Sequence, residues 1–466
     1  MPKSAFKKFF DDLKTAITGK EHNFTSGSLN RAIFMLAVPM VLEMVMESLF
    51  AVVDIYFVSK VSMDAVATIG LTESVIMVVF AIAIGISMAA AAMVARRIGE
   101  EKPSDAADAA WQSIVLGLSV SLVLGLAGFF FATDILKAMG GSAELIAQGK
   151  NYTRWMFGGN VTIMLLFLIN AVFRGAGDAS LAMRTLWLAN GINIILDPIL
   201  IHGLGPIPSM GVEGAAIATT IGRGTGVVYQ LYHLFNKGSV VRIKRQNLVF
   251  KPTLIFKLIK VSLGGIGQYL IGTASWIFLV RIIAIFGSDV VAGYTISFRI
   301  IMFTILPSWG LSNAAATLVG QNLGAKNPDR AERSVWLSAQ YNLVFMLIVS
   351  IVLWVFASPV VSFFNAEGEV LKTGVQSLKY VTASYVFFSY GMVVSQAFNG
   401  AGDTRTPTKI NFFAYWVFQI PVAYLLSVTL NLGAEGVFIT ILGSISLAAI
   451  IFVAIFKRGN WKETEI

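Results

Sequence analysis

Three carboxylate residues occur in the first long apolar stretch of the chain, where charged side chains are uncommon. Glu43, Glu47 and Asp54 are separated by four and then by seven residues, so they share one face if the stretch is helical. An ionisable side chain inside an apolar span is costly to bury and is a functional candidate by default. These acids are therefore the first residues to consider for chemistry.

A second polar set lies further along the first half of the chain. Asn193 and Asp197 are four residues apart in the fifth apolar stretch, and Thr219 follows in the sixth. With Asp54 they form an all-oxygen set, which suits a proton or a hard cation such as sodium. Two nearby buried carboxylates without a counter-ion cannot both stay charged, so one of them would take up a proton. The set is predicted to bind and release an ion; a purely structural hydrogen bond from either Asp to the backbone is the alternative.

Other residues in these stretches have two open interpretations each. Pro39 lies fifteen residues before Asp54, and a proline removes a backbone hydrogen bond and kinks its helix. A kink that straightens on protonation would be a switch, and a static kink is the competing interpretation. Glu43 and Glu47 either take part in ion binding or lie in a water-filled cavity near the cytoplasm, where they would attract cations. Arg223 lies near the middle of its span, and the sequence names no partner for it.

The elements that carry these residues are long and apolar. The chain has 466 residues, 56% of them hydrophobic and 13% charged, with a mean hydropathy of +0.74, whereas a soluble protein has roughly 25% charged residues. Apolar runs long enough to cross a bilayer are predicted to be helices, because barrel strands would be about 10 residues long and would alternate strictly. There are twelve such runs, near 32–58, 65–95, 110–131, 150–172, 182–203, 212–235, 255–286, 290–321, 334–356, 377–398, 409–430 and 434–456.

The distribution of positive charge predicts which ends of these helices face the cytoplasm. The net charge is +9, and 26 of the 35 Lys and Arg residues fall at the two termini and in the even-numbered loops. This is the positive-inside bias, which places both termini in the cytoplasm of a cell (inner) membrane protein and gives no reason to expect nucleic acid as a partner. There are no cysteines, and the three histidines form no cluster that would suggest a metal site or an enzyme.

The chain also repeats itself. The segment Phe173–Asp178 returns as Phe398–Asp403, an offset of 225 residues that also carries Gly99 to Gly324. With six spans in each copy, both halves enter the membrane from the same side, so a pseudo-twofold axis along the membrane normal is expected. The repeated Gly-Ala-Gly-Asp segments are interpreted as structural corners. The acids do not repeat, because the positions that match Asp54 and Asp197 are Leu279 and Val422.

The predicted fold is an all-α membrane protein with twelve transmembrane helices in two six-helix bundles. Its expected parts are an N-terminal segment 1–31, an N-lobe 32–235, a polar cytoplasmic linker 236–253, a C-lobe 254–456 and a cytoplasmic tail 457–466. Helically spaced Phe and Leu residues beside lysines favour an amphipathic helix on the cytoplasmic membrane surface for the N-terminal segment. A solvated tail is the alternative.

The chain resembles the multidrug and toxic compound extrusion (MATE) family over essentially all twelve spans. The resemblance is carried by the first helix ending Val53–Val58, by Asn193–Pro198, by Gly214–Thr219 and by the Gly324–Pro328 loop. It implies two lobes in a V shape around a central cavity. It also implies export of organic cations and other drugs in exchange for H⁺ or Na⁺, with no cofactor beyond the coupling ion.

The resemblance also implies roles for particular residues. Coupling would fall to Asp54, Asn193, Asp197 and Thr219, which could hold Na⁺, with Tyr152 and Asn170 in the same polar network and Pro39 bending the first helix. Gln268 stands where an acid is common in one branch of the family, which argues against an ion site in the C-lobe. Glu43 and Glu47 are outside the family pattern, which leaves an unusual substrate preference open.

The expected partners are membrane lipids and small, cationic amphipathic substrates, and the expected state is a monomer. A flippase or exporter of a lipid-linked or metabolite substrate on the same fold is the alternative. Such flippases usually have more spans and a cavity rich in Arg and Lys, whereas the N-lobe of this chain is rich in acids.

Overall fold

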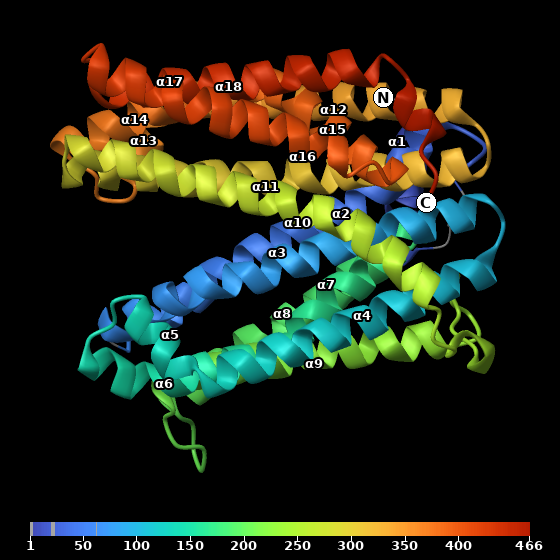
Figure 1. The fold of residues 1–466 in the computed structure, drawn as a ribbon, viewed down its shortest axis with the longest axis horizontal. Helices are drawn as coiled ribbons and strands as arrows, with labels where there is room; N and C mark the ends of the chain where they lie inside the picture. The colour runs from blue at the N-terminus through green and yellow to red at the C-terminus, as the bar shows by residue number, and fades with distance from the viewer. Residues whose placement is uncertain (1–2, 20–23, 62) are drawn as a thin grey trace.

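The computed structural model describes residues 3–19, 24–61 and 63–466, and in this part of the chain the regular structure is entirely helical. Long helices run side by side along the length of the molecule (Figure 1). The first half contains α1 (Lys3–Thr18), α2 (Leu29–Ser59), α3 (Met63–Gly99), α4 (Pro103–Phe130), α5 (Ala132–Ala138), α6 (Ala143–Gly158), α7 (Asn160–Gly175), α8 (Ala179–His202) and α9 (Gly211–Phe235).

The second half follows a short 3₁₀ turn (Arg245–Asn247) in the polar linker. It contains α10 (Pro252–Ile283), a 3₁₀ turn (Ala284–Phe286), α11 (Ser288–Gly324), α12 (Pro328–Val355), α13 (Ala357–Ser362), α14 (Gly368–Ala383), α15 (Tyr385–Ala401), α16 (Arg405–Asn411), α17 (Ile420–Tyr424) and α18 (Gly433–Phe456). Wide π-helical turns at Phe412–Gln419 and Leu425–Thr429 join α16 and α17 into one pass, and a 3₁₀ turn (Asn460–Glu463) follows α18.

The prediction of twelve spans in an all-α membrane fold is confirmed. Ten helices or end-to-end helix combinations in the described residues are long and apolar enough to cross a membrane. The remaining two passes are α9 and the pair α14–α15, which run along the bundle with the others (Figure 1). The fourth and tenth passes are each broken into two helices, at Gly159 and at Ser384, and these two breaks are again 225 residues apart.

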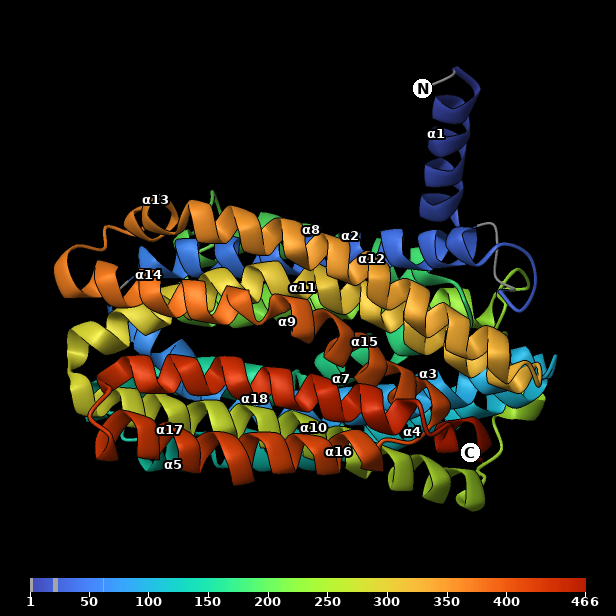
Figure 2. The same cartoon turned by 90° about the horizontal axis from the view of Figure 1, so that it is seen from above.

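The two halves form two layers that diverge toward the end of the molecule opposite the termini (Figure 1). They meet where α3 packs against α10 and where α2 packs against α11. Each half therefore contributes its first two membrane-spanning helices to the interface, α2 and α3 from one half and α10 and α11 from the other. Figure 2 shows α1 apart from the bundle and lying across the direction of the long helices.

The repeated glycines lie where the halves come closest. A Cβ atom on Gly99 would stand 1.9 Å from the carbonyl oxygen of Gln321, and one on Gly324 would stand 2.1 Å from that of Arg96. These two contacts are related by the offset of 225, since Arg96 matches Gln321. The sequence repeat is thus also a repeat of contacts, and glycine is required there for the close approach of two backbones.

The two Gly-Ala-Gly-Asp segments are structural corners, as predicted. Gly177 and Gly402 have φ angles of 89° and 90°, in the left-handed region that favours glycine. The carboxylate of Asp178 accepts a hydrogen bond from the Leu181 N–H at 3.1 Å, and that of Asp403 accepts one from the Thr406 N–H at 3.1 Å. Each aspartate therefore caps the helix that begins after its corner.

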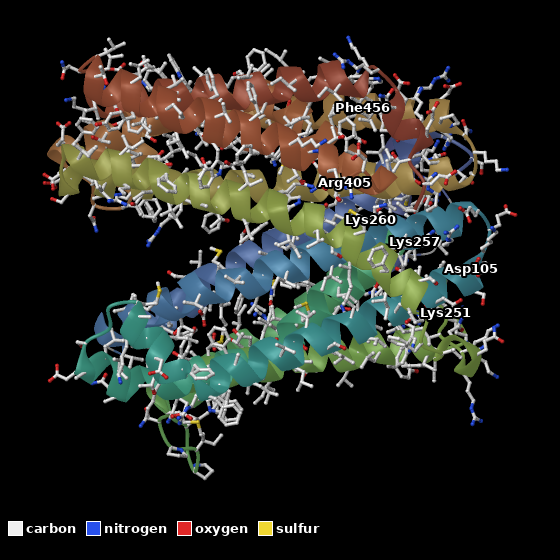
Figure 3. All side chains as sticks on the ribbon, in the orientation of Figure 1. Asp105, Lys251, Lys257, Lys260, Arg405 and Phe456 are labelled. Atoms are coloured by element: carbon white, nitrogen blue, oxygen red, sulfur yellow. The ribbon has the colours of Figure 1, made fainter. Side chains whose placement is uncertain are left out.

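Basic side chains gather at the end of the molecule that holds both termini. Lys251, Lys257, Lys260 and Arg405 all lie there (Figure 3). The polar linker is held against this end, because Lys251 forms an ion pair with Asp108 of α4 at 2.5 Å and Asn247 donates a hydrogen bond to the same carboxylate at 2.9 Å.

Candidate functional site

The four predicted ion-coupling residues come together inside the first half. Asn193 and Asp197 lie on α8, and the Asn193 side chain is 3.1 Å from the Thr219 hydroxyl of α9. With the amide turned to satisfy both of its ends, its nitrogen donates to Asp197 at 2.8 Å and its oxygen accepts from the Thr219 N–H at 2.9 Å. Asp54 of α2 lies within hydrogen-bond reach of Asp197. These residues are called the Asp54 cluster below.

Close packing of α8 and α9 positions this cluster. A Cβ atom on Gly222 would stand 2.6 Å from the carbonyl oxygen of Ala189 and 3.1 Å from the Asn193 Cβ, so only a glycine lets the two helices approach this far. Asp197 is fully buried, and one oxygen of each of Asp54 and Asp197 is buried without a hydrogen-bond partner. The unsatisfied oxygens are acceptors that a bound cation or proton would satisfy.

The candidate donor set contains two carboxylates, one amide and one hydroxyl. No group of three or more His, Cys, Asp or Glu side chains placed to hold a metal ion occurs in residues 3–19, 24–61 and 63–466. A cation at the Asp54 cluster would therefore depend on Asn193 and Thr219 for its remaining oxygen ligands.

Three further ionisable residues lie next to the Asp54 cluster. Tyr152 of α6 is buried and interacts electrostatically with Asp54 and Asp197. Arg223 of α9 and Glu73 of α3 interact electrostatically with Asp54. The sequence alone names no partner for Arg223 and does not single out Glu73. Glu73 carries a signal that could have identified it, because it is an acid inside the second apolar run.

A cavity of about 250 Å³ lies between the two halves. Its walls come from α2, α3, α7 and α8 of the first half and from α10, α11 and α15 of the second. Most lining groups are apolar or aromatic, including Met44, Phe80, Met88, Phe167, Tyr269 and Trp309, and the polar ones include Glu43, Glu47, Asn170, Arg174, Asn313, Gln396 and Asn399. This mixture is typical of a small-molecule site, which is mostly apolar with a few orienting polar groups.

The acids Glu43 and Glu47 both line this cavity. Glu43 is 2% exposed and pairs with Arg174 at 2.8 Å, while its second oxygen has no hydrogen-bond partner. Glu47 accepts a hydrogen bond from the Asn190 amide at 3.0 Å. Arg174 offsets the charge of Glu43, so Glu47 is the acid that leaves this side of the cavity with a negative charge.

Asn170, which the family resemblance groups with Tyr152, lines this cavity. Its amide nitrogen donates to Glu43 at 3.2 Å, and its oxygen accepts from Gln230 at 2.6 Å. The physical reason is the direction of α7, which carries Asn170 to the level of Glu43, three helical turns along α2 from Asp54.

The second half matches this arrangement with neutral groups. Positions 43 and 174 correspond at the offset of 225 to Gln268 and Asn399, which exchange two hydrogen bonds of 2.9 and 3.2 Å. Asn399 also donates to Gln396 at 3.1 Å. The same pair of positions is thus an ion pair in one half and an amide pair in the other.

Pro39 is buried where α2 crosses α11. The helix α2 continues through this proline. A Cβ atom added to Gly310 of α11 would stand less than 3 Å from the carbonyl group of the next residue, Met40. The proline therefore lies at a contact between the two halves, next to the cavity-lining segment of α2.

A family model described as MatE matches residues 39–199 and 263–425. The "Probable multidrug resistance protein NorM" of Thermotoga maritima is 25% identical over 440 residues, which cover 94% of each chain. The "FAD transporter" of Shewanella oneidensis is 24% identical over 404 residues, 87% of this chain and 89% of that protein.

The fold is also similar to solved structures. A crystal structure described as the outward-facing conformation of a multidrug resistance MATE family transporter superposes with a TM-score of 0.88 at 26% identity, covering 94% of this chain and 98% of that one.

Proposed function

This chain belongs to the MatE family of multi-pass membrane transporters, and we propose that it is a cation-coupled antiporter that exports organic cations, drugs or other toxic compounds by alternating access. The observation that carries the proposal is the cavity between the halves, which combines aromatic and Met side chains with the carboxylates Glu43 and Glu47. Flexible thioethers and rings accept many apolar shapes. Buried acids favour a positively charged substrate.

The coupling ion, H⁺ or Na⁺, binds at the Asp54 cluster, with Tyr152 supporting it. This assignment is supported by the buried unsatisfied oxygens of Asp54 and Asp197 and by their absence from the matching positions of the second half. Pro39 is proposed as the bending point of α2, because this helix contains Asp54, lines the cavity and contacts α11. No other cofactor is required.

The protein is proposed to act as a monomer in the cell (inner) membrane with both termini in the cytoplasm. The basic end of the molecule, which holds Lys251, Lys257 and Lys260, supports this orientation (Figure 3). In this orientation the halves diverge toward the outside. The crosswise direction of α1 is the one expected of an amphipathic helix lying among lipid headgroups (Figure 2).

The experiment that tests this function is transport of ethidium, a fluorescent organic cation, in proteoliposomes. Gradients of pH and of Na⁺ are imposed separately on the wild type and on Asp54→Asn. We expect gradient-driven export by the wild type and none by Asp54→Asn, while ethidium exchange without a gradient persists in both. Full gradient-driven export by Asp54→Asn would contradict the coupling role, and the absence of transport by the wild type would contradict the function.

Export of an anionic metabolite is the second candidate, and the name of the Shewanella relative is its motive. Arg174 in the cavity wall favours an anion, but its charge is opposed by Glu43 at 2.8 Å, and Glu47 adds a further negative group. Competition of ethidium transport by flavin nucleotides distinguishes the two candidates.

A further inference from the structure

Arg223 is a buried cation next to the proposed coupling site. It is 8% exposed, and its Nη1 atom has no hydrogen-bond partner. Its guanidinium carbon lies 6.0 Å from the centroid of the Phe50 ring and 5.7 Å from that of Phe80. Two aromatic faces therefore hold the side chain in place, and no carboxylate of the described residues lies within ion-pair distance of it.

The positions of these neighbours place the guanidinium beside the Asp54 cluster. Thr219 is one helical turn before Arg223 on α9, and Phe50 is one turn before Asp54 on α2. Arg223 therefore lies one turn toward the basic end of the molecule from the cluster. Three ionisable groups interact with it electrostatically, Asp54 from α2, Glu73 from α3 and Tyr152 from α6, and Asp197 of α8 lies next to Asp54.

The two kinds of carboxylate around Arg223 differ in their contact with solvent. Glu73 is exposed, on the same face of α3 as Phe80 and Ile84, which line the cavity. Asp197 is fully buried. Little solvent screens the field of Arg223 at the fully buried Asp197. Arg223 therefore offsets one of the two negative charges that Asp54 and Asp197 would present to a transported metal cation.

We propose that Arg223 is an internal counter-cation that excludes Na⁺ from the Asp54 cluster, so that this transporter is not driven by sodium. The inference rests on the proposed function in that it takes the Asp54 cluster as the coupling site. In the last pair of spans the two halves are related by an offset of 222 residues, which takes Gly211 to Gly433. The same offset takes Arg223 to Ile445, an uncharged residue. The charge is therefore a feature of the half that carries the acids, as expected if it acts on them.

The test compares wild type, Arg223→Gln and Arg223→Lys in ethidium-loaded proteoliposomes at constant pH, with and without a Na⁺ gradient. Arg281→Gln is the matched control, because it removes a positive charge from α10 at a groove away from the cavity. We expect no sodium response in the wild type, Arg223→Lys and Arg281→Gln, and at least about a tenfold gain of sodium-driven export in Arg223→Gln.

Calorimetric titration of each detergent-purified protein with NaCl gives an independent readout, and size-exclusion profiles identify any variant that fails to fold. If Arg223→Gln does not fold, Na⁺ binding to the wild type alone decides: saturable binding or sodium-driven export by the wild type overturns the proposal. An Arg223→Gln protein that folds but binds no Na⁺ also overturns it. These results leave the proposed function standing, whereas a wild type that does not transport ethidium under any imposed gradient would contradict the function itself.

Discussion

Glu43 and Arg174 form an ion pair of 2.8 Å in the cavity wall, at the two positions where the second half of the protein has a hydrogen-bonded pair of amides. The chain therefore contains its own neutral version of this contact, Gln268 with Asn399. Removing one partner of a buried ion pair leaves an uncompensated charge and costs about 3–5 kcal/mol, whereas replacing both partners by a well-packed neutral pair is often tolerated.

This relationship predicts a specific double variant. Arg174→Asn alone should lower the free energy of unfolding strongly, while Glu43→Gln/Arg174→Asn should recover most of the loss, because it recreates the pair of the second half. Thermal unfolding of the single and double variants in detergent measures this difference. Equal destabilisation by both would contradict it. Export of ethidium by the double variant should stay close to that of the wild type, since one negative and one positive charge are lost together and Glu47 remains in the cavity.

The close approach of the halves at Gly99 and Gly324 predicts that added methyl groups are not tolerated there. A Cβ at either position would overlap a backbone carbonyl of the other half, so Gly99→Ala and Gly324→Ala should each cost at least about 1–3 kcal/mol. Gly272→Ala on α10 is the matched control, because its Cβ would meet no atom within 4 Å. Melting temperatures provide the comparison, and a Gly99→Ala protein as stable as Gly272→Ala would show that the backbones can separate at no cost.

Much of this architecture could be predicted from the sequence, because it depends on patterns that run along the chain. The offset of 225 between the Gly-Ala-Gly-Asp segments predicted two halves, and it also relates their corners, helix breaks and glycine contacts. The spacing of Asn193 and Asp197 predicted that the two side chains share one face of a helix. The hydrogen bonds that link Asn193 to both Asp197 and Thr219 agree with this.

The remaining features depend on how separate helices pack, which no local pattern in a single sequence reveals. Asn170 was grouped with Tyr152, but the level at which α7 meets α2 brings it to Glu43. The surroundings of Arg223 come from four other helices, so no local pattern could name them. Glu73 differs, because it is an acid inside the second apolar run and its position in the sequence is a local signal.

The hydrogen bond between Asn193 and Thr219 predicts a contrast between neighbouring threonines. Thr219→Val removes a hydroxyl from the Asp54 cluster, whereas Thr220→Val removes one that bonds only to the Ala216 carbonyl of its own helix, at 2.8 Å. A buried hydrogen bond contributes about 0.5–1.5 kcal/mol. Gradient-driven export by Thr219→Val should therefore fall by roughly threefold to tenfold, while Thr220→Val should match the wild type. Similar effects of the two changes would show that packing of α9 alone is responsible.

The segment that follows α18 docks across the boundary between the halves. Trp461 is 1% exposed and stacks on Phe456 at 4.6 Å, and Arg96 of α3 donates a hydrogen bond to the Thr464 carbonyl at 2.8 Å. Trp461→Ala should release this segment, since the loss of a buried aromatic side chain costs about 3–5 kcal/mol. Faster hydrogen exchange of residues 457–466, with little change in α12, is the expected result. Unchanged exchange would mean that the polar contacts alone hold the segment.

The same docking should weaken in acid through Glu100. Its partial burial opposes ionisation, but the hydrogen bond and charge of Arg97, together with Lys102, outweigh this and lower the pKa of Glu100 below its ordinary value of 4.5. Because the folded pKa is the lower one, the stabilisation is complete above the ordinary pKa and is lost as the pH falls through the lowered value. Arg97 donates to Glu100 at 2.7 Å and to the Ile466 carbonyl at 2.9 Å, so protonation of Glu100 frees the arginine that holds the segment.

Hydrogen exchange of residues 457–466 should therefore accelerate between pH 7 and about 3 in the wild type. In Glu100→Gln it should already be faster at neutral pH and should change less on acidification, and a pH response equal to that of the wild type would rule out this carboxylate as its origin.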